Sequence, residues 1–89
     1  MTIRDTLRAI TEDKKVCISN IPVYANGEIM TGSADHDKLY FNAKKHVYMR
    51  YDNALQAIMD APDDILNQTI YTMTNFDTFI TLDYKVVCE

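Results

Sequence analysis

Glycine and serine are scarce in this chain of 89 residues. Gly27 and Gly32 are the only glycines, which excludes a glycine-rich phosphate-binding loop and a dinucleotide-binding fingerprint. Ser19 and Ser33 are the only serines, and neither lies in the context of a nucleophile elbow. The chain therefore lacks the usual signatures of nucleotide-dependent enzymes and of serine hydrolases.

Cysteines and long apolar runs are also rare. Cys17 and Cys88 are 71 positions apart and match no metal-binding or redox spacing, so we expect free buried thiols, no metal and no cofactor. A disulfide between the two cysteines is the alternative in an oxidising compartment. No segment has the apolar length of a signal peptide or a membrane span. We therefore expect a cytoplasmic protein without a membrane partner.

Size and composition indicate a single domain spanning residues 1–89. Hydrophobic residues make up 47% of the chain and charged residues 25%, which is typical of a small globular protein. The pattern predicts an α+β fold, with a mainly antiparallel sheet of about six short strands packed by two helices. Because the helices can cover only one face of such a sheet, we expect the other face to be partly open.

Capping residues and apolar spacing predict the two helices. Thr2 is expected to cap the first helix, with Asp5 completing an imperfect capping box and the helix ending near Thr11. Asp52 is expected to cap the second helix, and Pro62 to end or kink it before one further turn. The residues expected to be buried are Ile3, Leu7 and Ile10 in the first helix, and Ala54, Leu55, Ile58 and Met59 in the second.

Alternating apolar residues between turn signals predict the strands. The first strand begins at Val16 and is expected to stop at Pro22, because proline cannot donate to a central ladder. Asn26-Gly27 is the strongest hairpin signal. A final hairpin is expected to join 69–74 to 79–87. The core face of its second strand is expected to hold Ile80, Leu82, Tyr84 and Val86.

Acidic residues are absent from the segment 38–51, and this is the sharpest feature of the chain. The segment holds four of the nine Lys and Arg residues, so its formal charge is +4, while thirteen acids and five bases elsewhere give −8. It also holds four of the nine aromatic residues. Such asymmetry in a short chain indicates a contact surface. The expected basic-aromatic face consists of Lys38, Tyr40, Lys44, Lys45, His46, Tyr48 and Arg50.

A hairpin accounts for the pattern of this segment. A three-residue loop, Ala43-Lys44-Lys45, keeps apolar residues on the core side and tyrosines and cations on the open side. Tyr40 then faces Tyr48, and Lys38 faces Arg50. Like charges directly opposite are unfavourable in a sheet, so a nearby acid or a bound anion is expected to offset this pair. The core side is expected to hold Leu39, Phe41, Val47 and Met49.

A second candidate surface is acidic and surrounds the second helix. Carboxylates on a rigid scaffold can imitate the phosphates of DNA and occupy the basic channel of a nuclease. Acids at helix N-termini are also stabilised by the helix dipole, which is the purely structural explanation. Tyr71, Phe76 and Phe79 are expected either to anchor such a contact or to pack in the core and turns. The acidic surface consists of Asp52, Asp60, Asp63 and Asp64.

An enzyme is not expected. Asp35-His36-Asp37 is the most enzyme-like cluster, because a carboxylate can orient an imidazole as a base or ligand. Three consecutive residues cannot all point at one centre, and no second His, Asp or Glu set stands at ligand spacing. A solvated loop explains the cluster better. A small enzyme that uses His36 or His46 is the weakest of three hypotheses.

Both ends of the chain carry recurrent motifs. They are Thr2-Ile3-Arg4-Asp5-x-Leu7 with Lys15-Val16-x-Ile18, and Asp64-Ile65-Leu66-Asn67-x-x-Ile70-Tyr71 followed by Ile80-Thr81-Leu82. Through them the chain resembles small proteins carried by phages and mobile elements of low-GC Gram-positive bacteria. In those proteins a short helix leads into a first strand, and a helix and a β-hairpin finish the chain. The segment 33–51 departs from the pattern. The resemblance implies a mobile-element accessory protein, a class rich in stoichiometric inhibitors of bacterial defence, including anti-CRISPR proteins.

Two functions are therefore expected ahead of an enzyme. The first is a non-catalytic phage or mobile-element accessory protein that acts by stoichiometric protein binding, as an anti-CRISPR-like inhibitor of a bacterial defence system. Its partner would be a host protein in the bacterial cytoplasm, such as a nucleic-acid-acting defence enzyme. The alternative is a nucleic-acid or nucleotide-binding module that uses the hairpin 38–51. Pairing into a homodimer, through the open sheet face or an edge strand at 79–87, is a further expectation.

Overall fold

The strands form one mixed sheet in the computed structural model, which describes residues 1–29 and 47–87. The order across the sheet is β2-β1-β4-β3; both outer pairs are antiparallel and the central β1–β4 pair is parallel. The α+β prediction is confirmed. The described residues form four strands rather than about six, however, and the parallel central pair makes the sheet mixed. The strands are β1 (Lys15–Val23), β2 (Tyr48–Tyr51), β3 (Ile70–Asn75) and β4 (Phe79–Val87).

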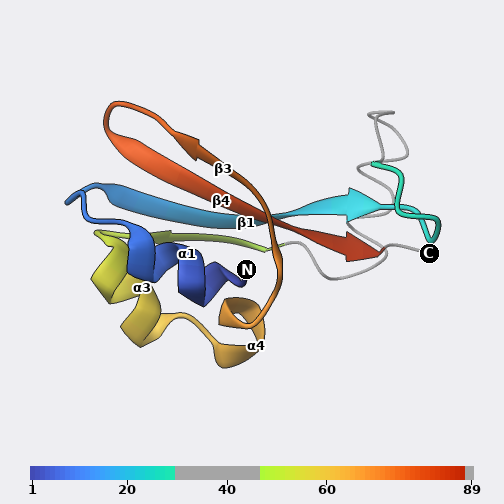
Figure 1. The fold of residues 1–89 in the computed structure, drawn as a ribbon, viewed down its shortest axis with the longest axis horizontal. Coiled ribbons are helices and arrows are strands. Elements are labelled where there is room, and N and C mark those ends of the chain that lie inside the picture. Colours follow the sequence, from blue (N-terminus) through green and yellow to red (C-terminus); the bar gives the residue numbers. More distant parts are fainter. Residues whose placement is uncertain (30–46, 88–89) are drawn as a thin grey trace.

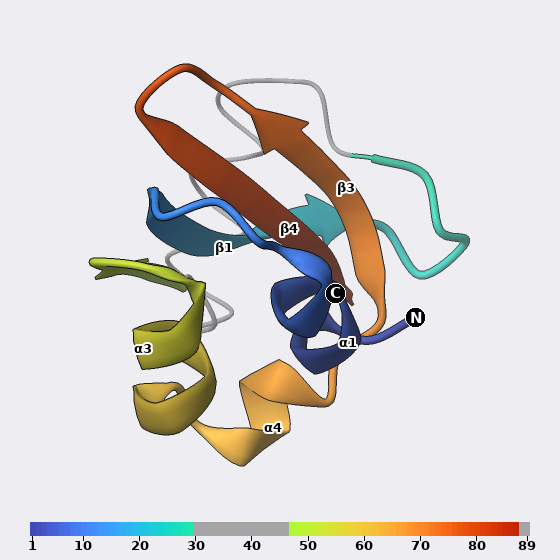
Figure 2. The ribbon, with the colours of Figure 1, turned by 60° about the vertical axis from the view of Figure 1, so that its left-hand side comes forward.

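Three helices lie together on one face of the sheet, as Figures 1 and 2 show. The opposite face carries no helix from the described residues, which agrees with the expected open face. The third helix is the further turn that was expected after Pro62, which itself stands at the N-cap position. The helices are α1 (Ile3–Ala9), α3 (Ala54–Asp60) and α4 (Asp63–Leu66).

The parallel pairing of β1 with β4 forms the centre of the sheet. It runs in unbroken register from Lys15 opposite Phe79 to Val23 opposite Val87. Since β4 is paired on both sides, the expectation that 79–87 is an edge strand is wrong. Among the described strands, β2 and β3 are the edges.

The core lies between the sheet and the helices. Side chains alternate between the two faces of a strand, and the even-numbered residues of β1 and β4 point towards the helices. This confirms the predicted core face of β4 for three residues, whereas Val86 is only half-buried. The buried core consists of Ile3, Leu7, Val16, Ile18, Ala54, Ala57, Ala61, Leu66, Ile80, Leu82 and Tyr84.

The capping residue of α3 differs from the prediction by one position. Asn53, and not Asp52, is the N-cap: its side chain accepts a hydrogen bond of 2.8 Å from the backbone N–H of Gln56. The backbone N–H of Asp52 in turn donates to Oε1 of Gln56 at 2.6 Å. Asp52 and Asn53 are both good capping residues, so sequence alone does not separate them.

The buried side of α3 also differs from the prediction. Ala54 and Ala57 face the core, whereas Leu55 is 67% exposed and Met59 is 74% exposed. Residues three and seven positions after Ala54 lie on the same side of the helix as Ala54, and these residues are Ala57 and Ala61. Small residues there allow α3 to pack closely against its neighbours, and the larger apolar side chains are left outside.

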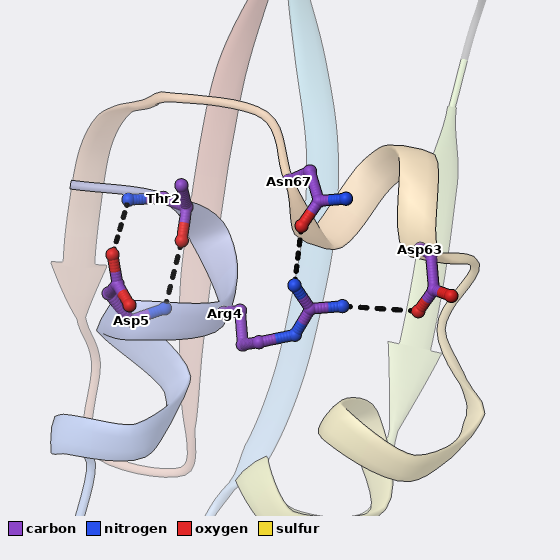
Figure 3. Close-up of polar contacts among 5 residues, drawn as sticks. All are labelled: Thr2, Arg4, Asp5, Asp63 and Asn67. Atoms are coloured by element: carbon purple, nitrogen blue, oxygen red, sulfur yellow. Dashed lines mark hydrogen bonds and ion pairs between the residues drawn. The ribbon is translucent and has the colours of Figure 1, made fainter.

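The start of α1 confirms the expected capping box, drawn in Figure 3. The Thr2 hydroxyl accepts from the backbone N–H of Asp5 at 3.1 Å, and the Asp5 carboxylate accepts from the backbone N–H of Thr2 at 3.2 Å. Both bonds satisfy N–H groups that a helix start leaves without partners. The helix ends at Ala9, slightly before the expected Thr11.

β1 continues through Pro22 to Val23, so the expected interruption at this proline is wrong. The ladder with β2 covers only Val16 to Ser19, whereas the ladder with β4 extends to the end of β1. Beyond Ser19 the described strands pair with β1 on one side only. A proline is tolerated there, because no second ladder needs the missing N–H.

The Asn26-Gly27 signal marks a hairpin turn, as predicted. The backbone N–H of Gly27 donates to the carbonyl of Tyr24, and the N–H of Tyr24 donates to the carbonyl of Glu28, both at 2.8 Å. Gly27 has a φ of +89°, in the left-handed region that glycine adopts without strain. The bond between Tyr24 and Glu28 encloses a three-residue loop, 25–27. Val23 and Ile29 form an isolated antiparallel β-bridge just beyond it.

The structure describes one of the two cysteines. Cys17 is a buried free thiol opposite Thr81, and Cys88 lies outside the described residues. The alternative of a disulfide between Cys17 and Cys88 therefore falls outside the described residues and stays a prediction.

Candidate functional site

The open face of the sheet is built from the strand residues that lie between the core positions. Cys17 pairs with Arg50 on one side and with Thr81 on the other; Ser19 pairs with Tyr48 and with Asp83. Side chains opposite each other in register point to the same face. The open face is defined by Lys15, Cys17, Ser19, Tyr48, Arg50, Thr72, Thr74, Phe79, Thr81, Asp83 and Lys85.

A depression of about 370 Å³ lies on this face across β2, β1 and β4. Cys17 is its most buried residue, with 5% of its surface exposed, and longer side chains surround this small one. The hydroxyl of Tyr48 lies 4.0 Å from the Sγ of Cys17. We call this feature the Cys17 depression; it is lined by Lys15, Cys17, Tyr48, Arg50, Thr78 and Phe79.

Two cations line the Cys17 depression, and both are exposed. Lys15 is a neighbour of Cys17 along β1 on the same face, and Arg50 is opposite Cys17 on β2. This places Lys15 and Arg50 diagonally across the strand pair, where backbone positions are roughly 7–8 Å apart. Neither makes a hydrogen bond or ion pair with any described residue. Their charges are therefore available to an anion.

The centre of the open face carries an anchored acid. The Asp83 carboxylate accepts hydrogen bonds from the hydroxyls of Ser19, on β1, and of Thr72, on β3, the latter at 3.3 Å. These bonds hold Asp83 across three strands, beside the row that contains Cys17. The negative charge of Asp83 therefore separates Lys15 and Arg50 from Lys85, the next cation along β4.

Lys85 and the aromatic residues of the β3–β4 hairpin have partners within the molecule. The Lys85 amino group lies 4.5 Å from the centre of the Tyr71 ring, a cation–π contact. The rings of Phe76 and Phe79 stack with their centres 4.6 Å apart. Phe76 is still 45% exposed, so this stack presents apolar surface next to the Cys17 depression.

The structure describes only part of the predicted basic-aromatic face. Tyr48 and Arg50 lie in β2 on the open face, as predicted, while Val47 and Met49 pack against the core. β2 pairs with β1; its expected partner strand and connecting loop fall outside the described residues. The same applies to Lys38, Tyr40, Lys44, Lys45 and His46, and to the cluster around His36.

Sequence reasoning missed the contribution of Lys15 and expected Phe79 either to anchor a contact of the acidic surface or to pack in the core and turns. The alternation of Lys15-Val16-Cys17-Ile18 does indicate that Lys15 and Cys17 share the polar face of β1. Phe79 lies beside them because the first strand pairs with the last, which places Phe79 opposite Lys15. No local pattern encodes that pairing.

The predicted acidic surface is split between two ends of α3. Asp52 precedes the helix, whereas Asp60, Asp63 and Asp64 gather where α3 meets α4. All four are exposed, but Asp63 forms an ion pair of 3.1 Å with Arg4, drawn in Figure 3.

Arg4 also donates to the side chain of Asn67, so it joins α1 to both ends of α4. Asp63 therefore has a structural contact within the chain, which weakens its availability to a partner.

Burial and nearby acids perturb two tyrosines beneath the helices. Burial raises the pKa of Tyr84, the Asp64 carboxylate raises it further, and a hydrogen bond with Asn20 opposes the change. Burial raises the pKa of Tyr51 as well, and the Asp60 carboxylate adds to the effect. Asn20 is itself buried and accepts from the backbone N–H of Val47 at 3.1 Å, which fixes the approach to β2. These contacts are structural and lie on the helix side of the sheet.

Comparisons with known proteins give no assignment: neither the family models, nor the curated sequences, nor the solved structures contain a match to this chain. Across residues 1–29 and 47–87, no cluster of three or more His, Cys, Asp or Glu side chains could hold a metal ion. None of the helices described is long and apolar enough to cross a membrane. The open face with its Cys17 depression is the candidate site, because it combines the depression with two exposed cations and the exposed ring of Tyr48.

Proposed function

We propose that this protein is a non-catalytic binding protein that acts by stoichiometric contact between the open face of its sheet and one protein partner. The supporting observation is the exposed aromatic and cationic surface around the Cys17 depression. Tyr48 is 59% exposed beside Arg50, and Phe76 is 45% exposed at the hairpin tip. Tyrosine, phenylalanine and arginine are the residues enriched in the energetic centres of protein interfaces.

The charges on the open face favour a protein over a long nucleic acid. A polynucleotide needs a groove of cations that follows its backbone. The described face instead has two available cations at one end, Asp83 in the middle and Lys85 held over Tyr71. With a net charge of −4 for the whole chain, this pattern suits one acidic site on a partner, surrounded by apolar contacts.

We propose a bacterial defence protein as the partner, with the anti-CRISPR class as the leading case. The support is the resemblance to phage and mobile-element proteins that is inferred from the motifs at both ends of the sequence, such as Thr2-Ile3-Arg4-Asp5. In this proposal the protein works in the cytoplasm of the bacterial host cell and blocks a nucleic-acid-acting enzyme. The exposed acids Asp60 and Asp64 form a second surface that such an enzyme, with its basic channel, would attract over a distance.

The test compares one substitution on the open face with a matched one on the helices. Phage plating is measured on a CRISPR-immune Gram-positive host that produces the wild-type chain, Arg50→Glu or Arg8→Glu. Both arginines are exposed and both substitutions change the charge equally, but Arg8 lies on α1. We expect wild type and Arg8→Glu to restore plating and Arg50→Glu to fail. Equal rescue by both variants would remove the open face as the working surface.

Nucleic-acid binding is the alternative, and salt separates it from protein binding. Each phosphate neutralised by a lysine or arginine makes the logarithm of the binding constant fall by roughly 0.7–0.9 per tenfold rise in salt. Binding of the purified chain to a single-stranded oligonucleotide is measured over a range of salt concentrations. A steep slope that Arg50→Glu reduces would favour the nucleic-acid function over the protein partner.

A further inference from the structure

We propose that the Cys17 depression is a binding site for a nucleoside monophosphate, with the phosphate between Lys15 and Arg50 and the base against the rings of Tyr48 and Phe79. This inference goes beyond the protein contact proposed above. It concerns the same face, but its test uses only the purified chain and small ligands, so either proposal can fail without the other.

The charge of the site fits a phosphate monoester. Lys15 and Arg50 supply two positive charges from neighbouring strands, and neither is neutralised by a described residue. A phosphate monoester carries about −1.5 to −2 at neutral pH, so it matches both cations, whereas a single carboxylate matches one. The arginine fork can donate two parallel hydrogen bonds to such a group, and the lysine adds a point charge.

The rim of the depression provides a platform for a planar base. Tyr48 lines the depression from β2 and Phe79 lines it from β4, and the Phe79 ring is stacked with the Phe76 ring. Stacking on an aromatic ring is worth about 1–3 kcal/mol per base and tolerates every base, so no base specificity is expected. The Thr78 hydroxyl is a further hydrogen-bonding group at the edge.

The size and surroundings of the site favour one nucleotide over a strand. The volume of about 370 Å³ falls in the range of small-ligand sites, roughly 300–1,000 Å³. Cys17 leaves room at the floor because its side chain is shorter than those around it. Beyond the depression, the fixed Asp83 carboxylate would repel a second phosphate. A chain of nucleotides would therefore gain little from the rest of the described face.

The experiment is an NMR titration of the ¹⁵N-labelled full chain with adenosine monophosphate and uridine monophosphate. Adenosine, inorganic phosphate, N-acetylaspartate and a single-stranded oligonucleotide are titrated for comparison. We expect both monophosphates to shift the amide signals of Lys15, Cys17, Arg50 and Phe79. Each part alone, the nucleoside or the phosphate, should bind more weakly than the monophosphate, since each uses only half of the site.

Variants with the charge removed test the two cations. Arg50→Gln and Lys15→Gln should each weaken monophosphate binding roughly tenfold or more, the effect of losing one charge-assisted hydrogen bond. Lys85→Gln is the matched control on the same face, and it should leave affinity unchanged because Lys85 is occupied by Tyr71. Tyr48→Ala should weaken the monophosphates and leave inorganic phosphate unaffected. All these positions are exposed, and the dispersion of the spectrum confirms that each variant is folded.

Four outcomes would overturn the site. The first is no shift at millimolar monophosphate, and the second is equal binding by Arg50→Gln and wild type. The third is equal affinity for inorganic phosphate or N-acetylaspartate, which would indicate a bare anion site suited to an acidic protein side chain. The fourth is much tighter binding of a single-stranded oligonucleotide than of either monophosphate, which would indicate a strand-binding surface.

Discussion

Neighbouring residues of β1 and β4 belong to two different surfaces. Ile18 and Leu82 are opposite each other and fully buried beneath the helices, while Cys17 and Thr81, one position earlier, belong to the open face. The free energy of folding comes mainly from the buried set, since removal of apolar surface from water is the dominant stabilising term. Binding can therefore be altered on one face without touching the residues that hold the fold.

Leu82 and Leu55 are expected to respond very differently to truncation. Leu82→Ala removes a side chain with no exposed surface, so we expect a loss of roughly 2–5 kcal/mol in the free energy of unfolding. Leu55 is 67% exposed, and Leu55→Ala should change it by no more than about 0.5 kcal/mol. Urea unfolding of both variants provides the measurement. A large effect of Leu55→Ala would mean that α3 is rotated relative to the arrangement described above.

Acid is expected to weaken the fold through two carboxyls. The backbone N–H and then the hydroxyl of Thr2 lower the pKa of Asp5, and hydrogen bonds from Lys14 and then Asn75 lower the pKa of Glu12. A carboxyl with a lowered pKa stabilises the folded state above its unfolded pKa, and the contribution is lost as pH falls through the folded value. The free energy of unfolding should thus be level at neutral pH and fall below about pH 4.

Asp5→Asn separates the capping box from general acid effects. This variant should be less stable than wild type at pH 7, and its stability should depend less on pH in acid. Asp13→Asn is the control, because Asp13 is exposed and makes no hydrogen bond with the described residues. Parallel pH profiles for wild type and Asp5→Asn would contradict the role of the box.

Elements whose signals are local could be predicted from the sequence, and those that depend on remote partners could not. The capping box at Thr2, the turn at Gly27 and the face of β4 each follow from residues within a few positions. The partner of β1 was missed because parallel pairing joins residues 64 positions apart, Lys15 and Phe79 among them. The rotation of α3 was missed because alanine carries little hydrophobic signal, so Leu55 and Met59 dominated the pattern.

The candidate site follows the same division between local and remote signals. The alternation in β2 correctly put Tyr48 and Arg50 on the open face, since it needs only the period of a strand. The depression between them and Phe79 exists only because β1 joins β2 to β4. Five members of the basic-aromatic face remain predictions, as they fall outside the described residues.

The hairpin turn after β1 is expected to depend on glycine through the backbone alone. No heavy atom lies within 4 Å of the position that a Cβ on Gly27 would take, so substitution creates no clash. The φ of +89° still disfavours L-residues, and Gly27→Ala should cost about 1–2 kcal/mol in the free energy of unfolding. Gly27→Asn should cost less, because asparagine enters this region more readily. Thermal or urea unfolding would show the order; an equal cost would point to a side-chain effect.

At the scale of the whole molecule, the helices carry an excess of acids and the open face an excess of cations. The helices hold Asp5, Asp60, Asp63 and Asp64 against Arg4 and Arg8, and the open face holds Lys15, Arg50 and Lys85 against Asp83. A charged partner therefore experiences a different electrostatic potential near each layer. This difference would favour one docking orientation over others. Salt should weaken this preference, because charges separated by more than a Debye length are screened.

Removal of the last strand is expected to abolish the fold. A chain ending at Thr78 loses β4, which pairs with both β1 and β3 and contributes Ile80 and Leu82 to the core. We expect no cooperative urea transition and a circular dichroism spectrum without sheet. The control is a chain ending at Val87, which keeps all of β4 and should unfold cooperatively. A cooperative transition in the shorter chain would show that β1 and β2 fold with the helices alone.

The parallel pairing of the first strand with the last also determines when the molecule can form during its synthesis. β1 is translated 64 residues ahead of its partner positions in β4, so its longest ladder can form only after residues 79–87 have been made. Until those residues leave the ribosome, that side of β1 has no neighbour, and three of the eleven buried core residues, Ile80, Leu82 and Tyr84, are absent. The central strand pair therefore closes only after β4 has been made, so the sheet cannot be completed strand by strand in the order of synthesis.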